Sequence, residues 1–206
     1  MARVGLLGGT FNPPHVGHLV CAMEARDQLG LDEVRLVVAA SPPHKEVEHD
    51  PGAAVRAELA GLAAAEEPGL AVSTIELERP GPSYTVDTLR ALHDEHPADE
   101  LIFIVGGDMA HSLLSWKQPE AVLALARLGV AEREEIRRRD VCSVLSGLAG
   151  VPERLDFFDM PRLDVSSSLV RRRVAAGRPI RHLVPAAVAE RVAALGLYRA
   201  GAPAWA

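Results

Sequence analysis

Cysteine, aromatic residues and long apolar runs are all scarce in this chain of 206 residues. The two cysteines, Cys21 and Cys142, lie far apart and match no zinc-binding spacing, so we expect free thiols in a reducing compartment, the cytoplasm. No apolar run reaches the roughly 18 residues that a membrane helix needs, so no membrane partner is expected. The apolar stretch near the first residue is too short for a signal peptide and favours a buried strand.

An excess of basic charge is missing as well. Lysine and arginine number 22 against 28 aspartates and glutamates, which gives a formal net charge of −6. Proteins that bind nucleic acid usually carry a basic surface, so we expect no nucleic-acid partner. An arginine run at 137–139 is typical of a solvated helix face. A small anionic ligand stays compatible with this balance, because a pocket can be locally positive on an acidic protein.

What the chain does have is a regular alternation of two patterns. Short apolar runs predict strands at 3–7, 33–40, 70–77, 100–107, 127–132 and 154–160. Helical patterns fall between and after them, at 17–30, 53–67, 84–96, 119–126, 133–150, 167–177 and 185–197. This order predicts a single α/β domain over 1–206, a Rossmann-like doubly wound parallel sheet with helices on both faces. A small helical part is expected at its C-terminal end, about 166–200.

Polar turn residues follow nearly every predicted strand. They form the segments GGTFNPPH, SPPHK, ERPGPSYT, GGDM and VSSS. The carboxyl ends of parallel strands lie at one edge of a sheet, where ligands of such folds bind. We therefore expect these five loops to form one site.

The first of these loops runs from Gly8 to His18 and carries the strongest signal. Glycines after a strand let the backbone approach a bulky ligand and present N–H groups to phosphate. His15 and His18 lie at the expected start of a helix, where anions prefer to bind, and both could donate to one phosphate. The loop is neither a GxGxxG dinucleotide motif nor a P-loop. The alternative is a strand–turn–helix whose histidines only cap or pack.

The second segment, VSSSLVR, ends at Arg171. Ser166 or Ser167 could cap the helix that begins there, and its N-terminus offers N–H groups to an anion within reach of Arg171. Taken alone, the segment is equally compatible with an ordinary cap and with a phosphate site.

Together the two segments resemble the HxGH and ISSTxIR motifs of the nucleotidylyltransferase superfamily. SPPHK at 41–45, GPSYTVDTL at 81–89, GGDM at 106–109 and SWK at 115–117 resemble, within it, the bacterial nicotinate-nucleotide adenylyltransferases. The resemblance extends from Val4 to Arg199. Asn12 stands where the family commonly has aspartate, and Gly107 where it commonly has alanine.

The resemblance implies transfer of the adenylyl group of ATP to nicotinate mononucleotide, with magnesium arriving on the ATP. His15 and His18 are the implied catalytic residues. The implied ATP-binding residues are Gly8, Gly9, Thr10, Phe11, His15, His18, Gly106, Asp108, Ser166, Ser167, Ser168 and Arg171. The implied nicotinate-mononucleotide-binding residues are His44, Lys45, Ser83, Tyr84, Thr85, Trp116 and Lys117. No protein ligands for a metal are expected, and a homodimer stays open.

Two other functions stay open at this point. A sister transferase that acts on phosphopantetheine shares the two motifs, but its members are usually shorter and lack the PSYT and SWK segments. A nucleotide-sensing module without catalysis would not need both His15 and His18. Release of pyrophosphate separates an enzyme from a sensor.

Overall fold

A computed structural model describes residues 1–42, 49–132, 138–148 and 152–200 of the chain. The described residues form a parallel sheet of six strands in the order β3-β2-β1-β4-β5-β6. The strands are β1 (Arg3–Gly9), β2 (Glu33–Val38), β3 (Leu70–Ser73), β4 (Glu100–Gly106), β5 (Arg127–Glu132) and β6 (Leu155–Asp159). The doubly wound parallel sheet predicted from the alternating pattern is therefore confirmed.

The described residues also form eight α-helices, the first six of which cover the two faces of this sheet. They are α1 (Val16–Gln28), α2 (Ala53–Ala64), α3 (Thr85–Glu95), α4 (Gly107–His111), α5 (Pro119–Leu125), α6 (Arg138–Leu145), α7 (Ser167–Ala175) and α8 (Ala186–Ala194). Side chains on successive strand residues point to opposite faces, so Leu6 packs in a core with α3 to α6, while Leu7 packs in a core with α1 and α2. Both strand faces are buried, which explains the continuous apolar runs in the sequence.

The order in which strands are added to the sheet reverses between β1 and β4. From β1 the strands run outward through β2 to β3, and from β4 they run outward through β5 to β6. Leu7 pairs with Leu36 of β2 on one side and with Ile104 of β4 on the other. Ligands of doubly wound sheets bind at the carboxyl ends of the strands beside this reversal. The loops after β1 and β4 are those that carry Gly8–His18 and Gly106–Asp108.

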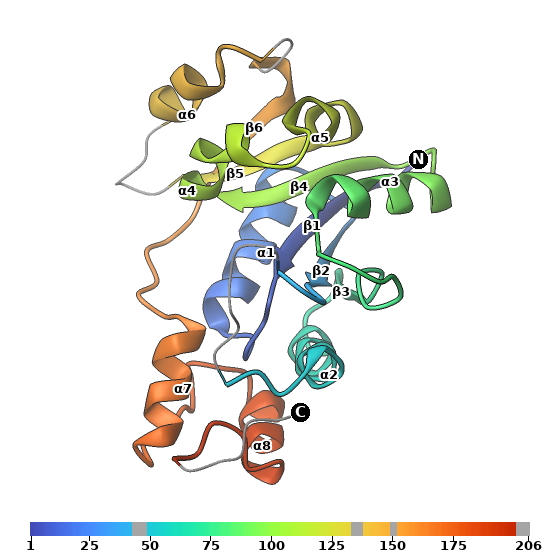
Figure 1. Cartoon of the computed structure of the whole chain (residues 1–206). Helices are drawn as coiled ribbons and strands as arrows, with labels where there is room; N and C mark the ends of the chain where they lie inside the picture. The colour runs from blue at the N-terminus through green and yellow to red at the C-terminus, as the bar shows by residue number, and fades with distance from the viewer. Residues whose placement is uncertain (43–48, 133–137, 149–151, 201–206) are drawn as a thin grey trace.

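The C-terminal helices build a third core away from the sheet. Val170 of α7 and Val188 and Val192 of α8 pack with Leu59 and Ala63 of α2. Figure 1 shows α7 and α8 beside α2 at one end of the molecule and α6 at the other end. This packing brings the second motif, at 165–171, close to the first half of the chain.

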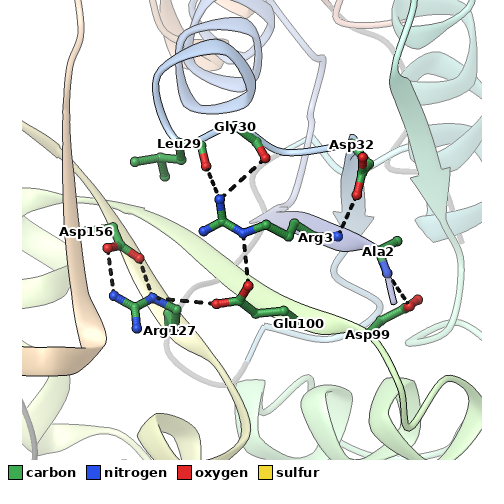
Figure 2. A network of polar contacts seen from close by, with 9 residues as sticks. All are labelled: Ala2, Arg3, Leu29, Gly30, Asp32, Asp99, Glu100, Arg127 and Asp156. Carbon is green, nitrogen blue, oxygen red and sulfur yellow. Dashed lines mark hydrogen bonds and ion pairs between the residues drawn. The ribbon is translucent and has the colours of Figure 1, made fainter.

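The opposite edge of the sheet, at the amino ends of the strands, is joined by charges (Figure 2). Arg3 of β1 contacts Glu100 of β4 at 2.9 Å, and Arg127 of β5 contacts Asp156 of β6 at 2.5 and 2.7 Å. Arg3 also donates to the Leu29 carbonyl at the end of α1, at 2.6 Å. Arg127 also lies 3.8 Å from Glu100, so these contacts tie the amino ends of β1, β4, β5 and β6 together.

Three sequence-based boundaries were wrong. β3 ends at Ser73 instead of Leu77, because Leu77 N–H bonds to the Thr74 carbonyl in a turn. The segment after β4, expected as a loop, is the short helix α4 from Gly107. The helix expected at 133–150 ends at Leu145 and is followed by a turn at 146–148, while 133–137 and 149–150 lie outside the described residues. Within the described residues, no helix is long and apolar enough to span a membrane.

Candidate active site

The loop after β1 folds back on itself before α1 begins. Phe11 adopts a left-handed backbone conformation with a φ of 49°, and its ring is buried in the core under the sheet edge. Asn12 is also buried, and its Oδ1 accepts a hydrogen bond of 2.7 Å from the hydroxyl of Tyr198. Any contact between Phe11 and a nucleotide therefore falls to the backbone, while the ring anchors the loop.

His15 and His18 form a stacked pair at the start of α1. Their ring centroids lie 3.7 Å apart with 24° between the ring planes, and the edge of Phe11 meets His18 at 5.0 Å. His15 is the N-cap residue, and its backbone N–H donates to Nδ1 of His18 at 3.2 Å. The histidines thus do cap and pack, as the structural alternative expected, and they also lie where the sequence motif places them.

Burial keeps both rings neutral near pH 7. It lowers the pKa of His15 from 6.5 to about 4, and burial together with the neighbouring His15 lowers the pKa of His18 well below its ordinary value. Because Nδ1 of neutral His18 accepts a hydrogen bond, its proton is carried by Nε2. Nδ1 of His15 is buried without a hydrogen-bond partner among the described residues. His18 can therefore act as a hydrogen-bond donor without being protonated.

The second motif lies directly against the first. Ser167 Oγ donates to the Pro13 carbonyl at 2.8 Å, and Arg171 Nη1 donates to the Asn12 carbonyl at 2.9 Å. A Cβ on Gly17 would lie 3.0 Å from the side chain of Val165, the residue before the serines, so glycine lets the two segments come this close without a shift of that side chain. The convergence of the two motifs, expected from the sheet topology, is present.

The three serines at the start of α7 make different hydrogen bonds. Ser166 is the N-cap, and its Oγ accepts a hydrogen bond of 3.1 Å from Leu169 N–H. Ser167 holds the first motif, and Ser168 Oγ accepts from Arg171 at 3.2 Å. The N-termini of α1 and α7 thus lie side by side, and the positive end of each helix dipole favours phosphate.

A cavity of about 480 Å³ opens beside this loop, between β1, β4 and the start of α3. Its walls include both predicted sets of binding residues: Gly8 and Gly106 from the ATP set, and Ser83, Tyr84, Thr85, Trp116 and Lys117 from the acceptor set. A second hollow of about 560 Å³ lies along the outer side of α1 and contains none of these residues. The cavity at the sheet edge is therefore the candidate site.

The start of α3 differs from the sequence-based expectation. The helix expected at 84–96 begins one residue later, at Thr85, and its N-cap is Tyr84, not Ser83. Ser83 Oγ instead accepts hydrogen bonds from the N–H groups of Ala40 and Ser41, at 3.0 and 3.1 Å. Ser83 therefore joins the start of α3 to the end of β2, because both segments run along the same wall of the cavity.

Trp116 and Lys117 complete the acceptor side. The Trp116 ring packs edge-on against Phe103, with centroids 5.9 Å apart, and is half-buried. Lys117 is exposed; its Nζ lies 2.8 Å from Asp87 and 4.5 Å from the centre of the Tyr84 ring. The lysine charge is thus already balanced by a carboxylate on α3.

The remaining predicted residues are less central. Asp108 is exposed in the first turn of α4, which Gly106 precedes as N-cap. His44 and Lys45 lie outside the described residues. Within the part of the chain that the structure describes, no group of three or more histidine, cysteine, aspartate or glutamate side chains could hold a metal ion.

One residue of the site was missed by the sequence analysis. Arg56 of α2 is fully buried, and its guanidinium bonds to the carbonyls of Thr10, Ala39 and Ala40 and to Asp50. The sequence did carry a signal for it. Arg56 falls three, four, seven and eight residues before the apolar positions that line the inner side of α2, so a charge stands on a buried face.

Comparison with known proteins agrees with this geometry. The cytidylyltransferase-like family model matches residues 6–173. A protein of Roseiflexus sp. named "Probable nicotinate-nucleotide adenylyltransferase" is 43% identical over 198 residues, 96% of this chain and 98% of its own length. A protein of the same name from Thermus thermophilus is 44% identical over 197 residues, 96% of this chain and 100% of its own.

The fold is also found among solved structures. A nicotinic acid mononucleotide adenylyltransferase of Plasmodium falciparum, complexed with NaAD, has a TM-score of 0.75 at 17% identity and covers 96% of this chain and 98% of its own. At that identity the likeness concerns the fold. The full-length similarity at above 40% identity goes further: the chain belongs to the cytidylyltransferase-like family and, within it, to the nicotinate-nucleotide adenylyltransferases.

Proposed function

We propose that this protein transfers the adenylyl group of ATP to nicotinate mononucleotide, giving nicotinate adenine dinucleotide and pyrophosphate in NAD biosynthesis. The observation that carries the proposal is the meeting of two helix N-termini and a neutral histidine pair beside a cavity at the edge of the sheet. Adenylyl transfer needs a site for the triphosphate next to a site for the second nucleotide, and the helix N-termini and the cavity offer these two sites. The names of the full-length relatives support the same reaction.

The chemistry is an in-line displacement at phosphorus. A phosphate oxygen of nicotinate mononucleotide forms a bond to the α-phosphorus of ATP, and the bond from that phosphorus to the bridging oxygen of pyrophosphate breaks. The attacking phosphate is already anionic near neutral pH, so no general base is required. Catalysis then consists of positioning and of stabilising the charge on the transferred group.

We assign that stabilisation first to His18. Its Nε2–H is a donor at the start of α1, and the stacked His15 ring, the His15 N–H and the Phe11 edge fix its orientation. Because the ring is neutral, the donor persists across the neutral range instead of depending on a proton taken from solvent. A preorganised donor of this kind is worth more in the transition state than in the ground state.

The leaving phosphates are assigned to the second motif. The N-terminus of α7, with Ser167 and Ser168, and the guanidinium of Arg171 lie next to the loop that starts at Gly8. Magnesium enters as part of the MgATP substrate, because phosphate oxygens and water are its preferred ligands. The backbone of Gly8, Gly9 and Thr10 would approach the triphosphate from the sheet side.

The acceptor is assigned to the far wall of the cavity. Trp116 offers a ring for stacking on the pyridine, and the first N–H groups of α3, at Thr85, have no carbonyl within the helix to bond to. Such N–H groups favour a carboxylate over an amide, since an amide would turn donors toward donors. This wall therefore suits nicotinate better than nicotinamide.

A pyrophosphate-release assay with a panel of acceptors tests the proposal. We expect turnover with ATP, magnesium and nicotinate mononucleotide, weaker turnover with nicotinamide mononucleotide, and none with phosphopantetheine. A preference for phosphopantetheine would assign the protein to the sister transferases. Binding of ATP without pyrophosphate release from any acceptor would identify a nucleotide sensor.

A further inference from the structure

Arg56 places a charged side chain at a buried position of α2, where an apolar residue is usual. It lies on the inner side of α2, none of its side chain is exposed, and the neighbouring inner positions of that helix are occupied by leucine and alanine. Burying a guanidinium is unfavourable unless its donors are satisfied, and a well-packed apolar residue is often at least as stabilising. The arginine therefore needs an explanation beyond packing.

Its contacts join the loop after β1, which we assign to ATP, to the end of β2, which lies beside the acceptor wall. Nη1 donates to the Thr10 carbonyl at 3.0 Å, in the loop after β1, and to the Ala39 carbonyl at 2.7 Å, at the end of β2. Nη2 donates to the Ala40 carbonyl at 3.3 Å. Nε contacts Asp50 at 2.9 Å, which holds the guanidinium plane from the other side.

The end of β2 is in turn tied to the acceptor wall. Ala40 and Ser41 donate to Ser83 Oγ, and Ser83 N–H donates to the Ser41 carbonyl at 2.8 Å. Ala39 itself lines the cavity. A continuous set of hydrogen bonds therefore runs from the triphosphate loop at Thr10, through Arg56, to the residue before the N-cap of α3.

We propose that Arg56 is a positioning residue for adenylyl transfer, which fixes the spacing between the loop that holds ATP and the loop that holds the acceptor. The inference rests on the proposed function, because it assigns the two loops to two substrates. In-line attack depends on the distance and angle between the reacting atoms, and a misplacement of about 1 Å can cost about a hundred-fold in rate. Arg56 touches neither substrate and acts through the carbonyls of Thr10, Ala39 and Ala40.

The proposal makes a specific kinetic claim. A residue that sets the relative placement of two substrates, each still bound by its own loop, affects the transition state more than either ground state. Lysine keeps the charge but has no planar fork to reach four acceptors. Arg56→Lys should therefore lower kcat by about ten-fold to a hundred-fold while each KM changes by less than about three-fold.

Two variants serve as controls. Arg191→Lys makes the same exchange at an arginine that contacts α2 from α8, through Glu58 at 2.7 Å, away from both loops. Leu59→Ala removes packing between α2 and the C-terminal helices. It controls for an effect on kcat that comes only from a loss of stability. Both should keep kcat within about two-fold of the original protein when assayed well below their unfolding temperatures.

The outcomes separate the inference from the function. A folded Arg56→Lys protein with unchanged kcat would overturn the positioning role, and so would an equal kcat loss in Leu59→Ala. If Arg56→Lys does not fold, Asp50→Asn releases the guanidinium from one side and should still lower kcat by about three-fold or more; unchanged turnover there rejects the role. Failure of the unaltered protein to release pyrophosphate contradicts the proposed function instead.

Discussion

At the scale of single residues, His15 and His18 show how burial prepares a donor. Their stacked rings lie at the start of α1, and burial lowers both pKa values, so that each ring is neutral near pH 7. The hydrogen bond into His18 Nδ1 leaves the proton on Nε2. The chemistry of the site is therefore set by which nitrogen carries the proton as well as by which residue is present.

Replacing His18 tests its place in the mechanism. We expect His18→Ala to lower kcat by about a hundred-fold to a thousand-fold, as loss of one preorganised donor does. Circular dichroism should show an intact fold. His96→Ala, at an exposed histidine that ends α3, is the matched control and should leave turnover unchanged. Near-normal turnover in folded His18→Ala would remove this residue from catalysis.

The lowered pKa values also predict how stability depends on pH. The unfolded chain takes up a proton on His15 near pH 6.5, whereas the folded protein resists it down to about pH 4. Between these values the unfolded state binds more protons, so the free energy of unfolding falls as the pH falls, by about 3 kcal/mol in full for His15. His18 contributes in the same direction. Above pH 6.5 neither residue changes the stability.

Urea unfolding at pH 7 and pH 4.5 measures this loss. A double variant, His15→Gln with His18→Gln, should lose less stability between the two pH values than the original protein, because glutamine does not titrate. Carboxylates titrate in both proteins, so the difference isolates the histidines. An equal loss in both proteins would show that burial of the histidines does not destabilise the protein in acid.

At the scale of elements, no side chain caps the start of α3, and the N–H group of Thr85 has no partner within the helix. Tyr84 is extended, with φ −89° and ψ 130°, and Thr85 is the first helical residue. Proline is tolerated at a first helical position, and an extended preceding residue suits it. The single donor at Thr85 can therefore be removed with little disturbance to the helix.

Thr85→Pro should erode the preference for the nicotinate acceptor. Loss of one hydrogen bond to a carboxylate corresponds to about ten-fold to a hundred-fold in relative kcat/KM. The measurement is kcat/KM on nicotinate mononucleotide divided by kcat/KM on nicotinamide mononucleotide. Thr85→Ala keeps the N–H and removes only the hydroxyl, so its ratio should match that of the original protein. A ratio unaffected by proline would mean that this N–H does not contact the carboxylate.

At the scale of the whole molecule, the two edges of the sheet have different tasks. The carboxyl edge carries the loops and the cavity, and the amino edge carries the charge network of Arg3, Glu100, Arg127 and Asp156 (Figure 2). The Arg127–Asp156 pair is bidentate and about three-quarters buried, so it is stronger than an open surface pair.

Asp156→Asn should therefore separate stability from activity. We expect the free energy of unfolding to fall by about 1 kcal/mol, with kcat and both KM values unchanged. Urea denaturation and the pyrophosphate assay on the same sample give both quantities. A drop in kcat without a drop in stability would instead couple the amino edge of the sheet to the site.

The sequence by itself determined the order of strands and helices, the doubly wound sheet and the convergence of the two motifs. These follow from local periodicity and from the rule that parallel strands end at one edge. The capping role of Ser166 could also be predicted, since a helix cap depends on residues close by in the sequence. His15 and His18 could be placed at a helix start for the same reason.

Only the tertiary structure decided the roles that depend on distant partners. Ser83 bonds to Ala40 and Ser41 instead of capping its own helix, and Arg56 bonds to two loops that precede it by 16 to 46 positions. The neutral state of the histidines depends on their burial in the folded protein. Local sequence carries propensity, whereas burial and long-range hydrogen bonds exist only once the chain has folded.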